Sequence, residues 1–220
     1  MRLQGAILDV DGTLVLSNDA HAQAWVEAFA EHGYAVPFER VRPLIGMGGD
    51  KLLPAVIPGL SDRQGVGKAI AERRKAIFAE CYAPTLKPAS GARQLLLRLR
   101  DDGLRLIVAS SAKKDELESL LKAAQVEDLI ADATTSSDAE ESKPAPDIVG
   151  AALEKLGLEP AQVIMLGDTP YDIESAGACG VGVIAVRSGG FDDRQLADAC
   201  AIYDDPADLL AHYESSPLRA

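Results

Sequence analysis

Residues 6–14 read Ala-Ile-Leu-Asp-Val-Asp-Gly-Thr-Leu, an apolar run that ends in two aspartates separated by one residue. The apolar run is typical of a buried strand, and Asp-Gly is typical of the turn that ends one. Two carboxylates held side by side repel each other unless a cation lies between them. Asp9 and Asp11 therefore predict either a plain strand-to-turn junction or a pair built for chemistry.

The composition is that of a globular protein, with 220 residues, 47% hydrophobic and 25% charged. This length predicts one domain, or one domain with a modest insertion. The formal net charge of −12 disfavours nucleic acid and anionic membranes as partners, because both require a basic surface. We therefore expect a small-molecule partner and a monomer or homodimer.

Targeting signals and cysteine pairs are not recognisable in the sequence. No stretch approaches the roughly 20 apolar residues that span a bilayer, and the first residues lack a signal-peptide pattern. We expect a cytoplasmic protein. Cys81, Cys179 and Cys200 show no metal-ligand spacing and are predicted to be reduced, buried thiols.

Apolar runs alternate with amphipathic helical patterns along most of the chain. This alternation predicts an α/β fold with a parallel sheet covered on both faces, whose ligand crevice lies outside the carboxyl ends of the strands. The predicted strands are residues 6–10, 104–109, 163–166 and 181–186, with a weaker one near 129–133. The predicted helices are residues 93–100, 114–124 and 147–156.

The segment between Leu14 and about Pro88 interrupts this alternation, because it shows helical patterns and no convincing strand. Residues 18–32 and 62–82 are its two long helical stretches. We predict a core domain of residues 1–14 and 89–220, with an inserted helical cap of residues 15–88.

Polar side chains follow the predicted strands where a parallel sheet would bring them together. Such a cluster of carboxylates favours Mg²⁺, which prefers oxygen ligands and retains water molecules that a phosphate can displace. One carboxylate can attack phosphorus and a second can transfer the proton, while a lysine neutralises the charge. The residues concerned are Asp9, Asp11, Ser110, Ser111, Lys143, Asp168 and Asp172.

Four of these segments, in this order, resemble the motifs of the haloacid dehalogenase (HAD) superfamily. They are Asp9-Val-Asp11-Gly12-Thr13, the strand-terminal Ser110, Lys143-Pro144, and Gly167-Asp168-Thr169-Pro170-Tyr171-Asp172. The resemblance implies a Rossmann-like core with a helical cap, as in the subgroup of phosphoglycolate phosphatase and β-phosphoglucomutase.

The resemblance also assigns roles. Asp9 would be the nucleophile, Asp11 the general acid/base, and Ser110 and Lys143 would bind the phosphoryl group. Asp9, the backbone carbonyl of Asp11, and Asp168 would hold Mg²⁺, with Asp172 as a direct or indirect ligand. The expected reaction is Mg²⁺-dependent hydrolysis of a phosphomonoester, such as a sugar phosphate or phosphoglycolate, through an aspartyl-phosphate. Asp11 favours phosphoryl transfer over dehalogenation.

Further substrate contacts are expected from both parts of the chain. His21, in the segment His21-Ala-Gln-Ala-Trp25, resembles a cap residue near the active site of β-phosphoglucomutase-like members. The loop Ile45-Gly-Met-Gly-Gly-Asp-Lys51 lies at the position of the cap's specificity loop, which makes Gly46 and Lys51 candidates. Gly12 and Ser111 are the corresponding candidates beside the core motifs. An exposed helix histidine and a simple glycine turn are the structural alternatives.

Three other functions remain open. A mutase is disfavoured because Gly49 stands where β-phosphoglucomutase carries an arginine that holds the distal phosphate. Phosphonoacetaldehyde hydrolase uses a cap lysine, but Lys51 is displaced from that position by two residues. A phosphate-binding regulatory protein would not need Asp11.

Overall fold

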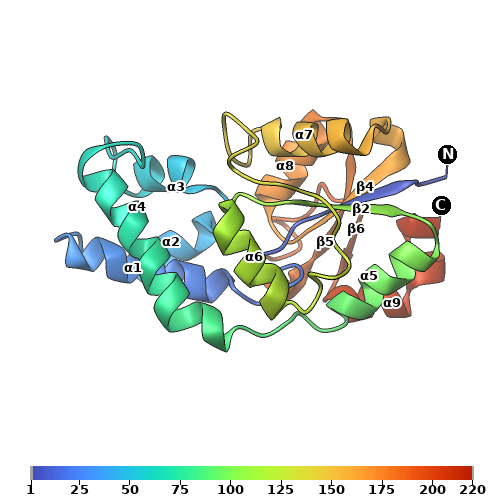
Figure 1. Ribbon diagram of the computed structural model, residues 1–220, viewed down its shortest axis with the longest axis horizontal. Coiled ribbons are helices and arrows are strands. Elements are labelled where there is room, and N and C mark those ends of the chain that lie inside the picture. The colour runs from blue at the N-terminus through green and yellow to red at the C-terminus, as the bar shows by residue number, and fades with distance from the viewer. Residues whose placement is uncertain (1, 220) are drawn as a thin grey trace.

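The computed structural model describes residues 2–219 and contains one six-stranded parallel sheet (Figure 1). The strand order is β3-β2-β1-β4-β5-β6, which confirms the predicted α/β fold with a Rossmann-like core. The strands are β1 (Gly5–Leu8), β2 (Arg105–Ala109), β3 (Ala133–Thr134), β4 (Val163–Gly167), β5 (Gly182–Val186) and β6 (Ala201–Tyr203).

The first strand lies at the centre of the sheet, where the direction of strand succession reverses. β1 pairs in parallel with β2 on one side, where Leu8 faces Val108, and with β4 on the other, where Leu8 faces Leu166. In such sheets the crevice for ligands forms at this reversal, outside the carboxyl ends of the strands. Asp9 and Asp11, directly after β1, therefore lie at the expected place.

Helices cover both faces of the sheet because side chains alternate along each strand. Ile7 belongs to the apolar cluster formed with α7 (Asp147–Leu156) and α8 (Pro170–Ala178). Ala6 and Leu8 point to the opposite face and belong to the larger cluster. That cluster includes residues of α5 (Ala92–Asp101), α6 (Lys114–Ala123) and α9 (Pro206–Ala211).

The chain between β1 and α5 is helical and lies to one side of the sheet (Figure 1). α1 packs against α4, and Trp25 of α1 is buried among their apolar side chains. This arrangement agrees with a helical insertion, while the proposed domain limits stay a prediction. The elements are α1 (Asn18–Glu31), α2 (Phe38–Val41), α3 (Gly49–Val56), α4 (Gly65–Ile77) and a π-helical segment, Phe78–Tyr82.

Several short elements differ from the sequence prediction. β3 begins where the expected strand 129–133 ends, and β6 was not predicted, because two or three residues are too few to show alternation. α3 lies in the segment that was expected to be helical, but no helix was placed at these residues, and it contains Pro54. Short 3-10 turns occupy Arg42–Leu44, Ala83–Thr85, Pro160–Gln162, Arg187–Gly189, Tyr213–Ser215 and Pro217–Arg219.

The cysteines correct one prediction. All three thiols are free, but Cys81 and Cys200 are exposed and Cys179 is half-buried, so the expected burial is wrong. The local sequence predicts their free state but not the packing around them. None of the helices in residues 2–219 combines the length and apolar character needed to cross a bilayer.

Candidate active site

The side chains that follow β1, β2 and β4 converge at one edge of the sheet, together with Lys143 from the loop after β3. Lys143 is fully buried, and its Nζ lies 2.7 Å from Asp9 Oδ1 and 2.8 Å from Asp172 Oδ1. It also donates a hydrogen bond of 2.7 Å to the carbonyl of Ala109. Burial alone would lower the pKa of Lys143, but Asp172 and Asp9 raise it above the ordinary lysine value, so the ammonium remains charged.

Asp9 has one occupied and one free carboxylate oxygen. Oδ1 accepts the hydrogen bond from Lys143, whereas Oδ2 is buried without any hydrogen-bond partner. Burial raises the pKa of Asp9 to about 7, and Lys143 only partly counteracts this. A buried, unpartnered oxygen costs free energy unless a ligand meets it. Oδ2 is therefore the atom of this site that most needs a cation or an electrophile.

Asp11 has a different environment, although it lies only two residues from Asp9. Its Oδ1 lies 2.8 Å from His21 Nε2 and accepts a hydrogen bond from Ser17 Oγ. Burial would raise the pKa of Asp11, but the charge and hydrogen bond of His21 lower it below the ordinary value. The two carboxyls thus have pKa values shifted in opposite directions, because Asp9 lies among other acidic groups and Asp11 lies against His21.

The ring of His21 is stacked on Phe78, with centroids 3.9 Å apart and planes inclined by 8°. Phe78 begins the π-helical segment that ends α4, so the helical insertion orients the histidine that contacts Asp11. The structure thus places His21 against Asp11, while the expected contact of His21 with substrate stays a prediction.

Asp9, Asp168 and Asp172 form an acidic group, with one ligand oxygen from each lying within 4.8 Å of the others. Asp168 is fixed by Asn18 Nδ2 at 2.8 Å and Thr13 Oγ1 at 3.2 Å. Burial, with Asp9 and Asp172 nearby, raises the pKa of Asp168 well above the ordinary value. Carboxylates that resist ionisation next to one another are stabilised by a divalent cation.

The group fits a hard cation such as Mg²⁺, because it offers several carboxylate oxygens and Asp9 Oδ2 is otherwise unpartnered. Asp172 is less available than the other two. Its Oδ2 accepts hydrogen bonds from the N–H and hydroxyl of Thr169, and its Oδ1 faces Lys143. Asp172 therefore holds the loop and Lys143 in place. The side chain of Asp11 lies outside the acidic group.

Glycines allow the backbone to approach Asp168. Gly12 has φ +78°, and a Cβ there would overlap Asp168 and Asn18. A Cβ at Gly189 would overlap the Asp168 carboxylate even more closely. Gly12 therefore makes room for the acidic group, and its expected contact with substrate stays a prediction.

Of the remaining predicted site residues, Ser110, Ser111 and Gly46 line the cavity beside Asp9, whereas Lys51 does not. Ser110 is buried at the end of β2 and accepts a hydrogen bond of 3.1 Å from the N–H of Ala112. Ser111, which follows β2, lies close to Gly46 of the helical insertion, with 3.5 Å between the Ser111 hydroxyl and the Gly46 carbonyl. Lys51 is not brought to the site, because its Nζ pairs with Glu141 at 2.6 Å.

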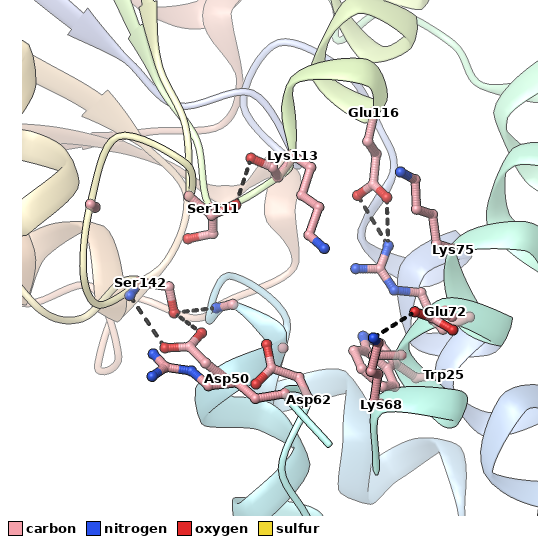
Figure 2. Close-up of a pocket in the computed structure, with 18 of the residues that line it drawn as sticks. Trp25, Asp50, Asp62, Lys68, Glu72, Lys75, Ser111, Lys113, Glu116 and Ser142 are labelled. Carbon is pink, nitrogen blue, oxygen red and sulfur yellow. Dashed lines mark hydrogen bonds and ion pairs between the residues drawn. The ribbon is translucent and has the colours of Figure 1, made fainter. Parts of the chain in front are cut away.

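Two connected cavities lie between the sheet edge and the helical insertion. The inner cavity, of about 60 Å³, is lined by Asp9, Asp11, His21 and Ser110 among others. The outer cavity, of about 320 Å³, is shown in Figure 2 and opens beside Lys113 and Asp62. The residues that line both are Trp25, Gly48, Gly49, Arg74, Ser111, Ala112 and Glu116.

Sequence reasoning missed four residues of this site: Ser17, Asn18, Arg74 and Glu116. Ser17 precedes α1 and Asn18 begins it, so both resemble ordinary helix-start residues, although their position just after the Asp9–Thr13 motif was a usable signal. Arg74 and Glu116 are 42 residues apart and carry no local signal, because exposed helix faces normally bear such charges.

Comparisons with known proteins agree with this geometry. The model of the haloacid dehalogenase-like hydrolase family matches residues 6–186. Phosphoglycolate phosphatase of Rhodospirillum rubrum is 33% identical over 215 residues, covering 94% of this chain and 89% of the relative. Protein SUPPRESSOR OF QUENCHING 1, chloroplastic, of Arabidopsis thaliana is 33% identical over 193 residues. That match covers 85% of this chain but only 18% of the longer plant protein.

A similar solved structure is that of a hydrolase from Pseudomonas syringae. The two chains superimpose with a TM-score of 0.89 at 28% identity, covering 97% of this chain and 98% of the other. The likeness extends over the sheet and the helical insertion together.

Proposed function

Because the chain belongs to the haloacid dehalogenase-like hydrolase family, we propose that it is a Mg²⁺-dependent phosphatase that hydrolyses a small phosphorylated metabolite through Asp9. The observation that carries this proposal is the different state of the two aspartates. Asp9 has one oxygen held by Lys143 and the other free, while Asp11 is linked to His21. Phosphatases among the relatives support the reaction class.

The proposed reaction has two steps. Asp9 Oδ2 attacks phosphorus as the bond to the leaving oxygen breaks, and Asp11 gives that oxygen a proton. Water then attacks the aspartyl-phosphate, giving its proton to Asp11 and releasing phosphate and free Asp9. Lys143 and Ser110 hold the phosphoryl oxygens.

Asp11 must carry a proton when the first step begins, although its pKa is lowered in the substrate-free site. A bound phosphoryl dianion is a like charge beside Asp11, and like charges raise a carboxyl pKa. Substrate binding therefore favours the protonated acid. Asp9, Asp168 and the backbone carbonyl of Asp11 would hold Mg²⁺, which supplies charge neutralisation for the phosphoryl group.

We expect removal of divalent metal by EDTA to reduce hydrolysis of p-nitrophenyl phosphate by about 100-fold or more. A metal Lewis acid contributes several kcal/mol of charge stabilisation, and each tenfold in rate is about 1.4 kcal/mol. Release of nitrophenolate measures the effect, and added Mg²⁺ in excess of EDTA should restore it. Full activity in EDTA would contradict the metal assignment.

We also expect Mg²⁺ to raise the melting temperature, and more so at pH 8 than at pH 5.5. Asp9 has a folded pKa of about 7, above its ordinary value of 3.8, so the metal-free folded state binds more protons than the unfolded state between these values. This contribution to the free energy of unfolding falls as pH rises through that window. Mg²⁺ bound to Asp9 takes the place of this proton and restores the free energy of unfolding that is lost as the pH rises.

At Mg²⁺ near 100 times its dissociation constant, linkage adds about 2.7 kcal/mol, or roughly 5–10 °C for a chain of this size. Differential scanning fluorimetry at the two pH values measures the shift. Equal shifts at both would show that protons on the acidic group do not compete with the metal.

A further inference from the structure

A part-buried ion pair joins the helical insertion to the sheet domain inside the cavity that would hold the leaving group. Arg74 of α4 places Nη1 2.9 Å and 3.0 Å from the two carboxylate oxygens of Glu116 on α6. Figure 2 shows Glu116 reaching down from α6 into the outer cavity, with dashed lines to the guanidinium below it. Both residues also line the inner cavity, beside Asp11.

The pair is fixed in place by its surroundings. The side chain of Glu116 is 8% exposed and that of Arg74 is 17% exposed. The Arg74 guanidinium also lies 5.1 Å from the centroid of the Trp25 ring. Two carboxylate contacts and an aromatic face therefore fix the position of Arg74, and its charge also contributes to lowering the pKa of Asp11.

Arg74 and Glu116 form part of the cavity wall, and their combined charge opposes the binding of a second anionic group on the substrate. Glu116 neutralises Arg74, and no other cation is supplied from position 49, which is a glycine. The other cations that line the outer cavity are Arg63 and Lys113, which are exposed and screened by water, Lys68, which pairs with Glu72 at 3.7 Å, and Lys75, which pairs with Asp115. A carboxylate or second phosphate in the cavity would meet the Glu116 carboxylate, and among residues 2–219 the lining of this cavity offers no buried cation without an acidic partner to compensate.

The same wall suits a neutral polar group. A hydroxyl can donate to a Glu116 oxygen, and carbon atoms can pack on the Trp25 side chain where it lines the cavity. The outer cavity of about 320 Å³ has the volume of roughly ten water molecules. That is more room than a two-carbon acid such as glycolate requires.

We propose that the Arg74–Glu116 pair determines specificity by charge, restricting the substrate to phosphomonoesters whose leaving group is uncharged and carries hydroxyls. This inference rests on the proposed phosphatase function. The sequence alone did not distinguish a sugar phosphate from phosphoglycolate as the substrate. The proposal favours a polyol or sugar monophosphate over phosphoglycolate. It also disfavours a mutase, which must hold a second phosphate.

Matched substrates that differ mainly in leaving-group charge test the proposal. The pairs are 2-hydroxyethyl phosphate with 2-phosphoglycolate, and glycerol 3-phosphate with 3-phosphoglycerate. For the wild type we expect kcat/KM to favour the uncharged member of each pair by about tenfold or more. Glu116→Gln frees Arg74 and should lower that ratio by about tenfold or more, partly by improving turnover of the charged member.

Glu31→Gln is the matched control. Glu31 pairs with Arg73, the neighbour of Arg74 on α4, and neither Glu31 nor Arg73 lines the inner or the outer cavity. This variant makes the same chemical change and frees a neighbouring arginine outside the cavity, so it should leave the ratio unchanged. If both variants lower the ratio equally, overall charge determines specificity and the proposal is wrong.

Arg74→Gln provides the opposite change, because it leaves the Glu116 carboxylate unpaired and should increase discrimination against the charged substrates. If either variant fails to fold, the ratios of kcat/KM measured for the wild type still test the proposal. Ratios near one, or a preference for the charged members, would overturn the Arg74–Glu116 assignment while leaving the phosphatase function intact. Absence of hydrolysis of all four substrates and of p-nitrophenyl phosphate would instead reject the phosphatase function.

Discussion

Replacing Asp9 with asparagine is expected to reduce kcat/KM for phosphomonoesters by roughly 10⁴- to 10⁶-fold, the range found when a nucleophile or its partner is removed from an enzyme. The amide has nearly the same shape and can still accept the hydrogen bond from Lys143, but it cannot attack phosphorus. The loss should therefore appear without loss of folding. Steady-state hydrolysis and circular dichroism measure the two properties separately.

Two further measurements make this test specific. Asp128→Asn removes the same charge from an exposed pair with Arg93, far from the catalytic aspartates in the sequence, and should leave kcat/KM within about twofold of the wild type. Mass spectrometry of rapidly quenched wild-type enzyme should find one added phosphoryl group on the peptide containing Asp9. Unchanged activity in Asp9→Asn would favour a different nucleophile, such as water.

Replacing Asp11 with asparagine should produce a different pattern, because Asp11 is expected to act on protons in both steps. For an alkyl phosphate, whose leaving oxygen needs a proton, we expect a loss of about 10²- to 10⁴-fold, the usual contribution of general acid–base catalysis. p-Nitrophenyl phosphate has a leaving group that is stable as an anion, so its first step should be much less affected. The second step still needs a base for water.

In Asp11→Asn with p-nitrophenyl phosphate we therefore expect a burst of about one nitrophenolate per active site, followed by slow turnover. Stopped-flow absorbance measures the burst. Equal losses for alkyl and nitrophenyl phosphates, with no burst, would show that Asp11 serves only to shape the site. A protein that binds phosphate without turnover would show neither pattern, which separates the regulatory alternative from the enzyme.

The different contacts of Asp9 and Asp11 underlie the different results expected of these two substitutions. Asp9 Oδ1 accepts a hydrogen bond from Lys143 and its Oδ2 is unpartnered, whereas Asp11 Oδ1 contacts His21. Two chemically identical side chains, separated by one residue, are thereby suited to the two functions proposed for them. The helical insertion supplies His21, so the pair is complete only when this insertion packs against the sheet.

Much of the fold was predictable from the sequence because its determinants are local. A buried parallel strand is a short apolar run, and the central strands β1, β2, β4 and β5 were located within a few residues. The short strands β3 and β6 were misplaced or missed because two or three residues carry no periodic signal. α3 was missed because its glycines and Pro54 are typical of a loop.

The sequence by itself determined which chemical groups follow the central strands, namely Asp9, Asp11, Ser110 and Asp168. A parallel sheet must bring those strand ends to one edge, so their meeting follows from local patterns and topology. Only the tertiary structure decided which atoms are occupied and which are free. The unpartnered oxygen of Asp9, the pairing of Lys51 with Glu141 and the contact of Arg74 with Glu116 are of this kind. The two pairs join residues 90 and 42 positions apart, and local sequence patterns do not encode interactions over such separations.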